Sequence, residues 1–359
     1  MKTVLYVTYN NLGDHSSGSG VRPYEMYKAF LERGYEVKVL SGFCGRGEGR
    51  QRRNLVRGIR QWLTKHRPDF CYIESSTYPI MNYCDYSLIR LLHKMKIPVG
   101  YFYRDFYRKF PKIFPKRRDL IGALKEYYLD FMQWRTDRIL FYVKQVYFPS
   151  EVCQSMFSYK NMKALPPAGD VRFLPQHELY KTCIYVGGVS ESYGIDLLIK
   201  AFCWLNMDRD SQSMYRLILV CREQEYISNK GLIGTHPWLE VHHVSGELLI
   251  PLYQMSDVGL LTLRHNAYNE LAVGTKLFQY LSYGLPVIST DVASMKAIID
   301  ENDFGVTATD DPYKFAEAIR KLLDNHENLK YYRKKIEENL PQKHLWIHRV
   351  DQIAEDLAR

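Results

Sequence analysis

The chain has 359 residues, of which 46% are hydrophobic and 25% are charged, and its formal net charge is +9. This length is enough for two domains with their own cores, and the composition is globular, which excludes a disordered protein. No apolar run is long enough to span a bilayer, and the first residues, MKTVLYVTYNN, lack the apolar region of a signal peptide. We therefore expect no transmembrane helix and no secretion signal.

The cysteines are odd in number and show no close pairing. They are Cys44, Cys71, Cys84, Cys153, Cys183, Cys203 and Cys221. This usage favours reduced thiols in a cytoplasmic protein over a disulfide framework or a zinc site.

Charge is divided unevenly along the chain. Residues 1–170 hold 29 Lys+Arg against 15 Asp+Glu, a net +14, whereas residues 171–359 hold 20 against 25, a net −5. The basic residues of the first half concentrate between Arg46 and Arg67 and between Arg104 and Arg118, where aromatics are interleaved. This mixture suits an anionic membrane surface on the inner face of the membrane, although single-stranded nucleic acid or a plain solvated face would give the same pattern.

In chain order, the first half alternates apolar strands with amphipathic helices. We expect strands at residues 4–8, 37–40, 70–74, 99–103, 139–142 and 147–149, and helices at 22–32, 59–65, 88–94 and 120–135. Residues 165–175, LPPAGDVRFLP, are rich in Pro and Gly and predict a linker.

The alternation restarts after this linker. We expect strands at residues 183–186, 216–220, 241–244 and 258–262, and helices at 195–204, 249–255, 313–323 and 344–357. The pattern predicts two α/β domains with doubly wound parallel sheets, whose ligands lie at the carboxyl ends of the strands. We place the domains at residues 1–170 and 171–343.

The loop after the first strand, NNLGDHSSGSGVRP, is rich in small residues. Gly18 and Gly20 would let the backbone approach a phosphate or sugar just before a helix, with Arg22 at the lip of the loop. The spacing is not GxGxxG, so a nicotinamide cofactor is not expected.

A second candidate phosphate site opens residues 274–289, GTKLFQYLSYGLPVIS. Apolar residues repeat at helical spacing from Leu277 to Leu281, and Gly284 ends the helix before a short apolar strand. Lys276 falls in the first turn, where backbone N–H groups lack partners and the helix dipole favours an anion. The alternative is an ordinary αβ unit whose lysine points into water.

Together these features resemble the GT-B glycosyltransferases of the family-4-like group (glycosyltransferase group 1), which transfer sugars from nucleotide-sugars. Four stretches carry the resemblance, in the family's order and spacing: the glycine loop with Arg22, LPPAGDVRF, IYVGGVSESYGIDLLIKAF and KLFQYLSYGLPVIS. The resemblance covers nearly the whole chain. It implies two facing Rossmann-like domains with a cleft between them, the acceptor mainly on the first, and a C-terminal crossover helix, residues 344–359, packing back on that first domain.

The resemblance also implies a donor site made mostly by the second domain. The residues that would hold the donor diphosphate are Gly274, Thr275, Lys276, Gly18, Gly20 and Arg22. The residues that would meet the donor nucleoside and sugar are Glu270, Val244, Ser245 and Gly188.

Two residues are candidates for catalysis on the acceptor side. Asp105 follows a predicted strand in the motif YRDFY, and a carboxylate beside Arg104 and Arg108 stays ionised, so it could orient or deprotonate a hydroxyl. An internal salt bridge would use the same residues. His15, in the glycine loop, is the other acid/base candidate, with a surface histidine as the alternative.

The sequence departs from the family's pattern at the donor site. Gly188 and Tyr193 stand where the family has an arginine and a lysine, and Gln279 stands where the second of its paired glutamates is expected. Lys276 would then supply the positive charge, with help from Arg264 or Arg222. These departures open the alternative of an inactive homologue.

Asp208-Arg209-Asp210 resembles the DxD metal motif of the other glycosyltransferase fold, but it falls in a polar turn. We expect no metal and no cofactor beyond the nucleotide-sugar. The leading hypothesis is a transferase that moves a sugar, with retention, to a glycan or lipid-linked acceptor at the cytoplasmic membrane face. The alternatives are an inactive nucleotide-sugar-binding subunit and a sugar-nucleotide epimerase of the same fold. A nucleic-acid partner is not expected, because no reader motif is present.

Overall fold

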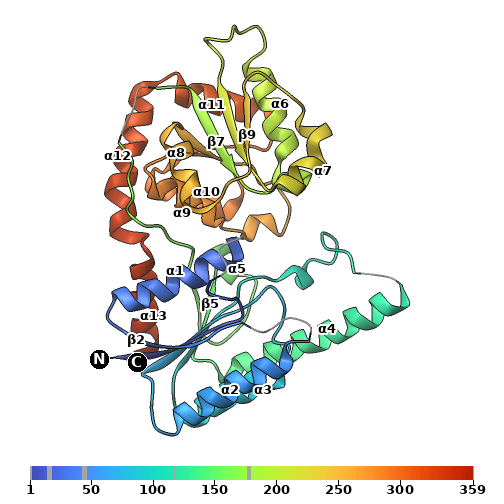
Figure 1. Cartoon of the computed structure of the whole chain (residues 1–359), viewed down its shortest axis with the longest axis vertical. Helices are drawn as coiled ribbons and strands as arrows, with labels where there is room; N and C mark the ends of the chain where they lie inside the picture. Colours follow the sequence, from blue (N-terminus) through green and yellow to red (C-terminus); the bar gives the residue numbers. More distant parts are fainter. Residues whose placement is uncertain (1, 14–17, 43–46, 117–118, 176–178, 359) are drawn as a thin grey trace. The chain divides into compact units, whose positions relative to one another are not determined.

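The computed structural model describes residues 2–13, 18–42, 47–116, 119–175 and 179–358. The chain divides into two compact units (Figure 1). The first unit is Met1–Pro166 together with Trp346–Arg359, and the second unit is Pro167–Leu345.

The first unit is built on a parallel six-stranded sheet in the order β2-β1-β3-β4-β5-β6. The strands are β1 (Thr3–Thr8), β2 (Glu36–Leu40), β3 (Phe70–Glu74), β4 (Val99–Phe102), β5 (Gln145–Phe148) and β6 (Met162–Ala164). The register pairs Thr8 with Glu74 and Glu74 with Phe102, so β1, β3 and β4 end side by side. Polar groups that follow these strands are therefore brought to one edge of the sheet.

Helices cover both faces of this sheet, which is why its central strands β1 and β3 are almost entirely buried and mostly apolar. The helices are α1 (Gly18–Glu32), α2 (Gly49–Leu63), α3 (Tyr83–Lys94), α4 (Leu120–Ile139), α5 (Glu151–Gln154) and α13 (Trp346–Ala358), with 3-10 turns η1 (Tyr107–Lys109) and η2 (Leu140–Tyr142). α1 and α13 pack together on one face, and α2, α3 and α4 lie on the other (Figure 1). Polar contacts also hold α13 to this unit, because the Tyr147 hydroxyl donates to Asp356 at 3.2 Å and Arg349 donates to the Pro166 carbonyl at 3.0 Å.

The second unit repeats the architecture, with the strand order β12-β11-β10-β7-β8-β9. The strands are β7 (Thr182–Val186), β8 (Arg216–Val220), β9 (Leu239–His242), β10 (Val258–Leu261), β11 (Val287–Thr290) and β12 (Gly305–Ala308). The helices are α6 (Ile195–Leu205), α7 (Glu223–Ile233), α8 (Ile250–Gln254), α9 (Thr275–Ser282), α10 (Ala293–Asn302), α11 (Pro312–Leu323) and α12 (His326–Lys343), with 3-10 turns η3 (Glu191–Tyr193), η4 (Gly246–Leu249) and η5 (Asn269–Leu271).

Two hydrophobic clusters fill the two sides of the second sheet. Side chains alternate along β7, so Cys183 and Tyr185 join a cluster with α6 and α11, whereas Ile184 and Val186 join one with α9 and α12. The prediction of two parallel, doubly wound sheets is confirmed.

Several expected boundaries were wrong. The predicted strand at 139–142 is the end of α4 followed by η2, because the apolar run fits either period and Ile139 and Leu140 continue the buried helical face. α1 begins at Gly18, four residues before the predicted start, and β9 ends at His242 rather than at residue 244. In the described part of the chain, no helix is both long enough and apolar enough to cross a bilayer.

Candidate active site

The N-terminus of α9 lies beside the end of β10 and carries the candidate diphosphate residues. Gly274 is the N-cap residue, and no side chain caps the helix, so the first-turn N–H groups of Thr275 and Lys276 are left to external partners. A Cβ atom at Gly274 would meet no protein atom closer than 4.0 Å, and its φ of −70° suits any residue. Neither packing nor backbone conformation therefore requires glycine at this position. The absence of close atoms also means that there is open space beside Gly274, at the start of the helix.

Lys276 is largely enclosed by protein, and burial lowers the pKa of its ammonium to about 8. The ammonium donates to the Gln279 side-chain oxygen at 2.8 Å. An amide oxygen satisfies a hydrogen bond but does not cancel the positive charge. The replacement of the expected glutamate by Gln279 thus leaves the charge of Lys276 uncompensated within the described residues.

Glu270 is held by two neighbours at the same edge of the sheet. One carboxylate oxygen accepts from the Ala293 backbone N–H at 2.7 Å and caps α10, and the other lies 2.5 Å from His265 Nδ1. The second ring nitrogen of His265 lies 2.7 Å from Asp291. Burial lowers the pKa of His265, but the hydrogen bonds and negative charges of Glu270 and Asp291 outweigh it, so the pKa is raised. Glu270 therefore belongs to a histidine–carboxylate cluster.

The glycine-rich turn after β7 is fixed by close packing rather than by charge. A Cβ atom on Gly188 would lie 2.6 Å from the Tyr193 ring, and the carbonyl of Gly188 accepts from Tyr185 at 2.7 Å. Gly194 has φ +73°, and a Cβ there would lie 1.8 Å from the Thr262 carbonyl oxygen. The turn is thus pressed against the end of β10.

The two expected helpers of Lys276 are engaged elsewhere: Arg222 pairs with Glu225 at 3.1 Å, and Arg264 has partners of its own. The Arg264 guanidinium forms an ion pair with Asp196 and donates to the Asp310 carbonyl at 2.7 Å. Val244 and Ser245 follow β9, with Val244 packed partly on the core and Ser245 exposed as the N-cap residue of η4. The structure therefore places Lys276, Glu270, Gly188 and Ser245 after or beside strand ends on one edge of the second sheet.

In the first unit, Gly18 and Gly20 lie in the first turn of α1 rather than in a loop. Arg22, expected at the lip of that loop, is 3% exposed and forms an ion pair of 3.0 Å with Glu74 at the end of β3. Its guanidinium also lies 3.7 Å from the centre of the Phe102 ring. In this structure Arg22 anchors the start of α1 to the sheet and does not present its charge to solvent.

Asp105 lies just beyond β4, on the same edge as Glu74. Its carboxylate accepts from the Thr77 hydroxyl at 2.9 Å and lies 3.7 Å from Arg104 Nε. Its side chain is 16% exposed, so it is held in place yet reachable. His15 lies outside the described residues.

The two basic segments are only partly available as surfaces. Arg52 is fully buried and binds Asp85 at 2.8 Å, and Arg108 is held by Glu126 at 2.8 Å and by Asp130. Lys116 also pairs with Asp130, at 2.7 Å. Arg46, Arg117 and Arg118 lie outside the described residues.

The DxD-like triplet forms a turn. Asp210 accepts from the backbone N–H groups of Gln212 and Ser213 at 3.1 and 2.9 Å, and from the Ser213 hydroxyl. These hydrogen bonds explain why the segment is polar, and the triplet lies in a turn as predicted.

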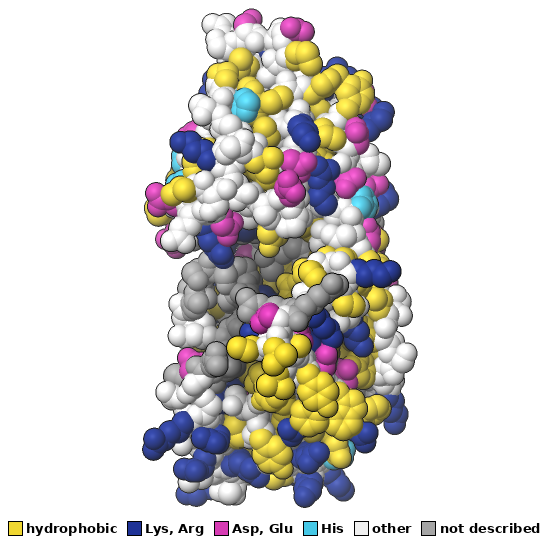
Figure 2. Space-filling view, turned by 90° about the vertical axis from the view of Figure 1, so that its right-hand side faces the viewer, with side chains coloured by type: hydrophobic (Ala, Val, Ile, Leu, Met, Phe, Trp, Pro, Cys, Tyr) yellow, Lys and Arg dark blue, Asp and Glu magenta, His cyan; other side chains and the backbone are white. Residues whose placement is uncertain are grey.

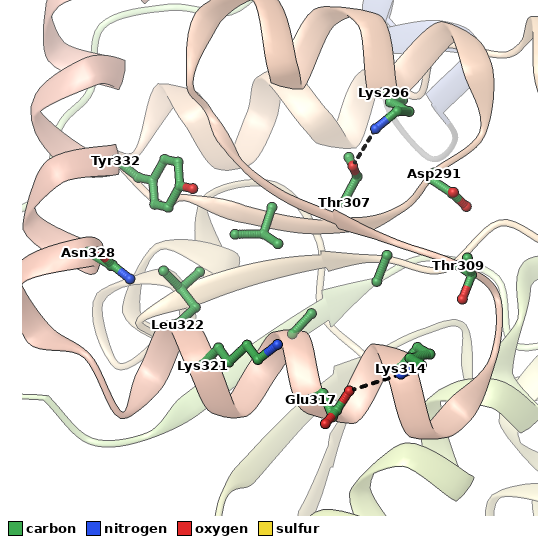
Figure 3. A pocket seen from close by; sticks show the side chains of 13 residues that line it. Asp291, Lys296, Thr307, Thr309, Lys314, Glu317, Lys321, Leu322, Asn328 and Tyr332 are labelled. Carbon is green, nitrogen blue, oxygen red and sulfur yellow. Dashed lines mark hydrogen bonds and ion pairs between the residues drawn. The ribbon is translucent and has the colours of Figure 1, made fainter.

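A cavity of about 610 Å³ lies along the open edge of the second sheet, beside β12 (Figure 3). Lys296 of α10 stands on one wall, and Lys314 and Lys321 of α11 stand on the opposite wall. Lys296 pairs with Asp300 at 2.8 Å and Lys314 with Glu317 at 3.4 Å, so most of the lysine charge is already balanced. The sequence-predicted site residues do not line this cavity.

Sequence reasoning missed the two partners that organise the site residues, Glu74 and His265. Glu74 is the one charged residue of the fully buried strand β3, and a charge at such a position is a readable signal of a polar partner. His265 had no such signal, because its carboxylate partners are 5 and 26 residues away and only the fold brings them together.

Residues 180–325 match the family model described as "Glycosyl transferases group 1". Among solved structures, WaaG, a glycosyltransferase involved in lipopolysaccharide biosynthesis, is 15% identical with a TM-score of 0.64, covering 98% of this chain and 99% of that chain. A trehalose-6-phosphate structure from E. coli bound with UDP-2-fluoro glucose is 13% identical with a TM-score of 0.60, covering 99% of each chain. An α-glucosyltransferase in complex with UDP is 11% identical with a TM-score of 0.61, covering 100% of each chain. No curated protein matches the chain.

At these identities the solved structures show a shared fold, and the family model adds that residues 180–325 are similar to glycosyl transferases. The family match lies within the second unit, where Lys276 and Glu270 are found, whereas the shared fold extends over nearly the whole chain. Residues 180–325 thus resemble the group 1 glycosyl transferases, and the chain as a whole shares the two-domain fold of these solved glycosyltransferase structures.

Proposed function

We propose that the protein transfers a sugar from a nucleotide-sugar to a hydroxyl of a glycan or lipid-linked acceptor, at the cytoplasmic face of a membrane and with retention at the anomeric carbon. The bond between the sugar and the diphosphate breaks, and a new bond forms to the acceptor oxygen. The departing nucleoside diphosphate takes the negative charge. The proposal needs one group above all, a cation that meets that charge.

Lys276 is the observation that carries the proposal. It is enclosed, it has no carboxylate partner among the described residues, and it stands at a helix N-terminus with open space in front of Gly274. A partly buried ammonium and unpartnered N–H groups stabilise a diphosphate more strongly as its charge develops during transfer. Because UDP or a UDP-sugar occupies two of the similar structures, uridine nucleotides are the first donors to test.

Asp105 is proposed as the acceptor-side residue. Thr77 and Arg104 orient its carboxylate, which could then align the acceptor hydroxyl or accept its proton. This role differs from that of Lys276, so the two residues can be separated by experiment.

The test compares Lys276→Ala and Asp105→Asn in donor binding and in transfer. We expect Lys276→Ala to lower both, with transfer reduced about a hundredfold or more, because a charge contact to the leaving group is lost. Asp105→Asn should keep the thermal shift given by the donor and lose transfer. Lys334→Ala, an exposed lysine of α12, is the matched control. Unchanged transfer by Lys276→Ala would refute the assignment.

A non-catalytic role has one observation in its favour. Gly188 and Tyr193 stand where similar enzymes are expected to carry an arginine and a lysine, and Arg264 is bound to Asp196, so the proposed donor site has fewer positive charges. A nucleotide-sugar-binding subunit would be stabilised by the nucleotide-sugar, yet it would neither transfer the sugar nor hydrolyse the donor with any acceptor supplied.

A further inference from the structure

The outward side of α4 is apolar, although this helix already buries another side against the first unit. Leu129, Met132 and Ile139 are buried, as expected for a helix that covers a sheet. On the other side, Leu120 and Tyr127 remain 92% and 74% exposed. A surface helix normally carries polar groups there, so a second apolar side indicates a second contact.

The exposed residues form a regular stripe, here called the α4 stripe. Its members follow one another at spacings of four and three residues and are Leu120, Leu124, Tyr127, Phe131 and Trp134. Successive members therefore stand on one side of the helix over about 21 Å. Ile121 and Tyr128 widen the stripe. Figure 2 shows a broad group of hydrophobic side chains in its lower part, with Lys and Arg around the lower border.

Two of the three acidic residues of α4 are already paired with cations. Glu126 and Asp130 are tied to Arg108, and Asp130 also to Lys116. Asp137 accepts from Gln133 at 2.9 Å and from Tyr159 at 3.0 Å. Asp137 keeps its negative charge, whereas Arg90, Arg135 and Arg138 form no ion pair among the described residues, so the charge left beside the stripe is mainly positive.

Three of these positive charges line a cavity of about 310 Å³ at the C-terminal end of the stripe, here called the arginine pocket. Arg90, Arg135 and Arg138 line it together with aromatic side chains, and no carboxylate does. Arg138 lies 5.3 Å from the Trp134 ring centre and Arg90 lies 5.8 Å from that of Tyr142. Within the described residues, none of the three forms an ion pair, so their charge is available to an anion.

We propose that the α4 stripe and the arginine pocket dock the protein on an anionic phospholipid bilayer. The stripe enters the boundary between headgroups and acyl chains, the aromatic rings lie at headgroup level, and the arginines bind lipid phosphates. Membrane docking depends on the proposed function in one respect: it would bring the protein to a lipid-linked acceptor.

Charge favours a bilayer over a second copy of the chain. A two-fold dimer through this surface would bring the three arginines of one copy toward those of the other. Nearby α2, which packs on α3, adds exposed Arg50, Arg53 and Arg57, and the helix itself contains no acidic residue. An anionic membrane is attracted by all of these groups, whereas an identical surface is repelled.

The test is sedimentation of the full-length protein with vesicles of phosphatidylcholine, alone or mixed with phosphatidylglycerol, in the absence of donor. We expect binding to the mixed vesicles only. The triple variant Leu120→Gln/Leu124→Gln/Tyr127→Gln should bind at least about tenfold more weakly. Arg135→Gln/Arg138→Gln should bind about 25-fold more weakly, at about fivefold for each arginine.

Matched controls come from the second unit. Ile227→Gln removes a comparably exposed apolar side chain, and Arg216→Gln removes an exposed arginine, and both should bind as the wild type does. Unchanged melting temperatures would exclude misfolding, since all the substituted positions of the stripe are exposed.

Three results would overturn the proposal: no binding to mixed vesicles, wild-type binding by both stripe and pocket variants, or a wild-type dimer that these variants dissociate. Transfer to a water-soluble acceptor separates this proposal from the proposed function. Vesicle binding without any transfer would leave docking intact and refute the transferase role, and transfer without vesicle binding would do the reverse.

Discussion

The glutamine at position 279, where a glutamate is expected, changes the electrostatics around Lys276. With glutamate at position 279, the ammonium would have a carboxylate partner within hydrogen-bonding distance. With Gln279 it has only an amide oxygen, at 2.8 Å, and burial lowers its pKa to about 8. No carboxylate among the described residues balances the charge of Lys276, so a bound anion would balance it. The affinity for that anion therefore depends on the protonation of Lys276 and hence on pH.

Nucleoside diphosphate affinity should therefore fall as pH rises above about 8, where the free protein loses the Lys276 proton. A bound diphosphate favours the charged lysine, so binding in that range takes up a proton. Lys276→Arg, whose guanidinium stays charged, should bind with little dependence on pH. Calorimetric titration in buffers of different ionisation enthalpy measures both effects. Equal pH dependence in the two proteins would contradict the role of Lys276.

His265 gives the second pH-dependent prediction. Its folded-state pKa is raised, so its contacts with Glu270 and Asp291 stabilise the fold fully below the unfolded-state pKa, about 6.5, and this stabilisation is lost as pH rises through the folded-state value. The wild-type advantage in melting temperature over His265→Gln should shrink as pH increases. His326→Gln, at an exposed position of α12, should show no such trend. A constant difference across pH would refute the assignment.

Among the elements, α13 has the largest consequence for the first unit. It packs on α1, contacts β3 and β4, and places Trp346 5.9 Å from the buried Arg22 guanidinium. Burial and the charge of Arg22 lower the pKa of Arg349 on the same helix, so two cations share a region that α13 closes.

Truncating the buried face of α13 should destabilise the fold. Ile353 is fully buried, and Ile353→Ala should lower the free energy of unfolding by about 2–5 kcal/mol. Glu355 is exposed on the same helix, and Glu355→Ala should change the free energy of unfolding by less than about 0.5 kcal/mol. Denaturant unfolding of the two variants measures the difference, and comparable losses would show that packing of α13 is not what holds the unit together.

The elements also show what could be predicted from sequence. Strands β1, β3, β7 and β10 were found because each is a short apolar run, and α9 because its apolar positions recur at helical spacing. α12 was missed, since only Leu329, Ile336 and Leu340 mark its narrow apolar side and Pro341 suggested a break. The predicted helix start marked Lys276 as a candidate, and the predicted strand end marked Asp105. The pairing of Arg22 with Glu74, 52 residues apart, required the fold.

At the scale of the whole molecule, the two units differ in charge and in proposed ligand. The basic first half carries the α4 stripe and arginine pocket, and the acidic second half carries Lys276. Each unit has its own sheet and core, so each should respond separately to its ligand.

A calorimetric scan should resolve two unfolding transitions, of which a nucleoside diphosphate raises only one. At a hundredfold excess over its dissociation constant the ligand adds about 2.7 kcal/mol, which is a shift of about 5–10 °C for a unit of this size. Lys276→Ala should abolish the shift and leave the other transition unchanged. A single transition, or equal shifts of both, would show that the units unfold as one.

The position of α13 also bears on how the protein is made. The chain builds the first sheet, leaves it to build the whole second unit, and returns with Trp346–Ala358 to cover β3 and β4. During synthesis the first sheet is thus complete in its strands long before its last covering helix exists, whereas the second unit is complete before that helix emerges. The usual order, in which the N-terminal domain matures first, is reversed here, and the nascent first sheet keeps an apolar face uncovered until α13 has been synthesised.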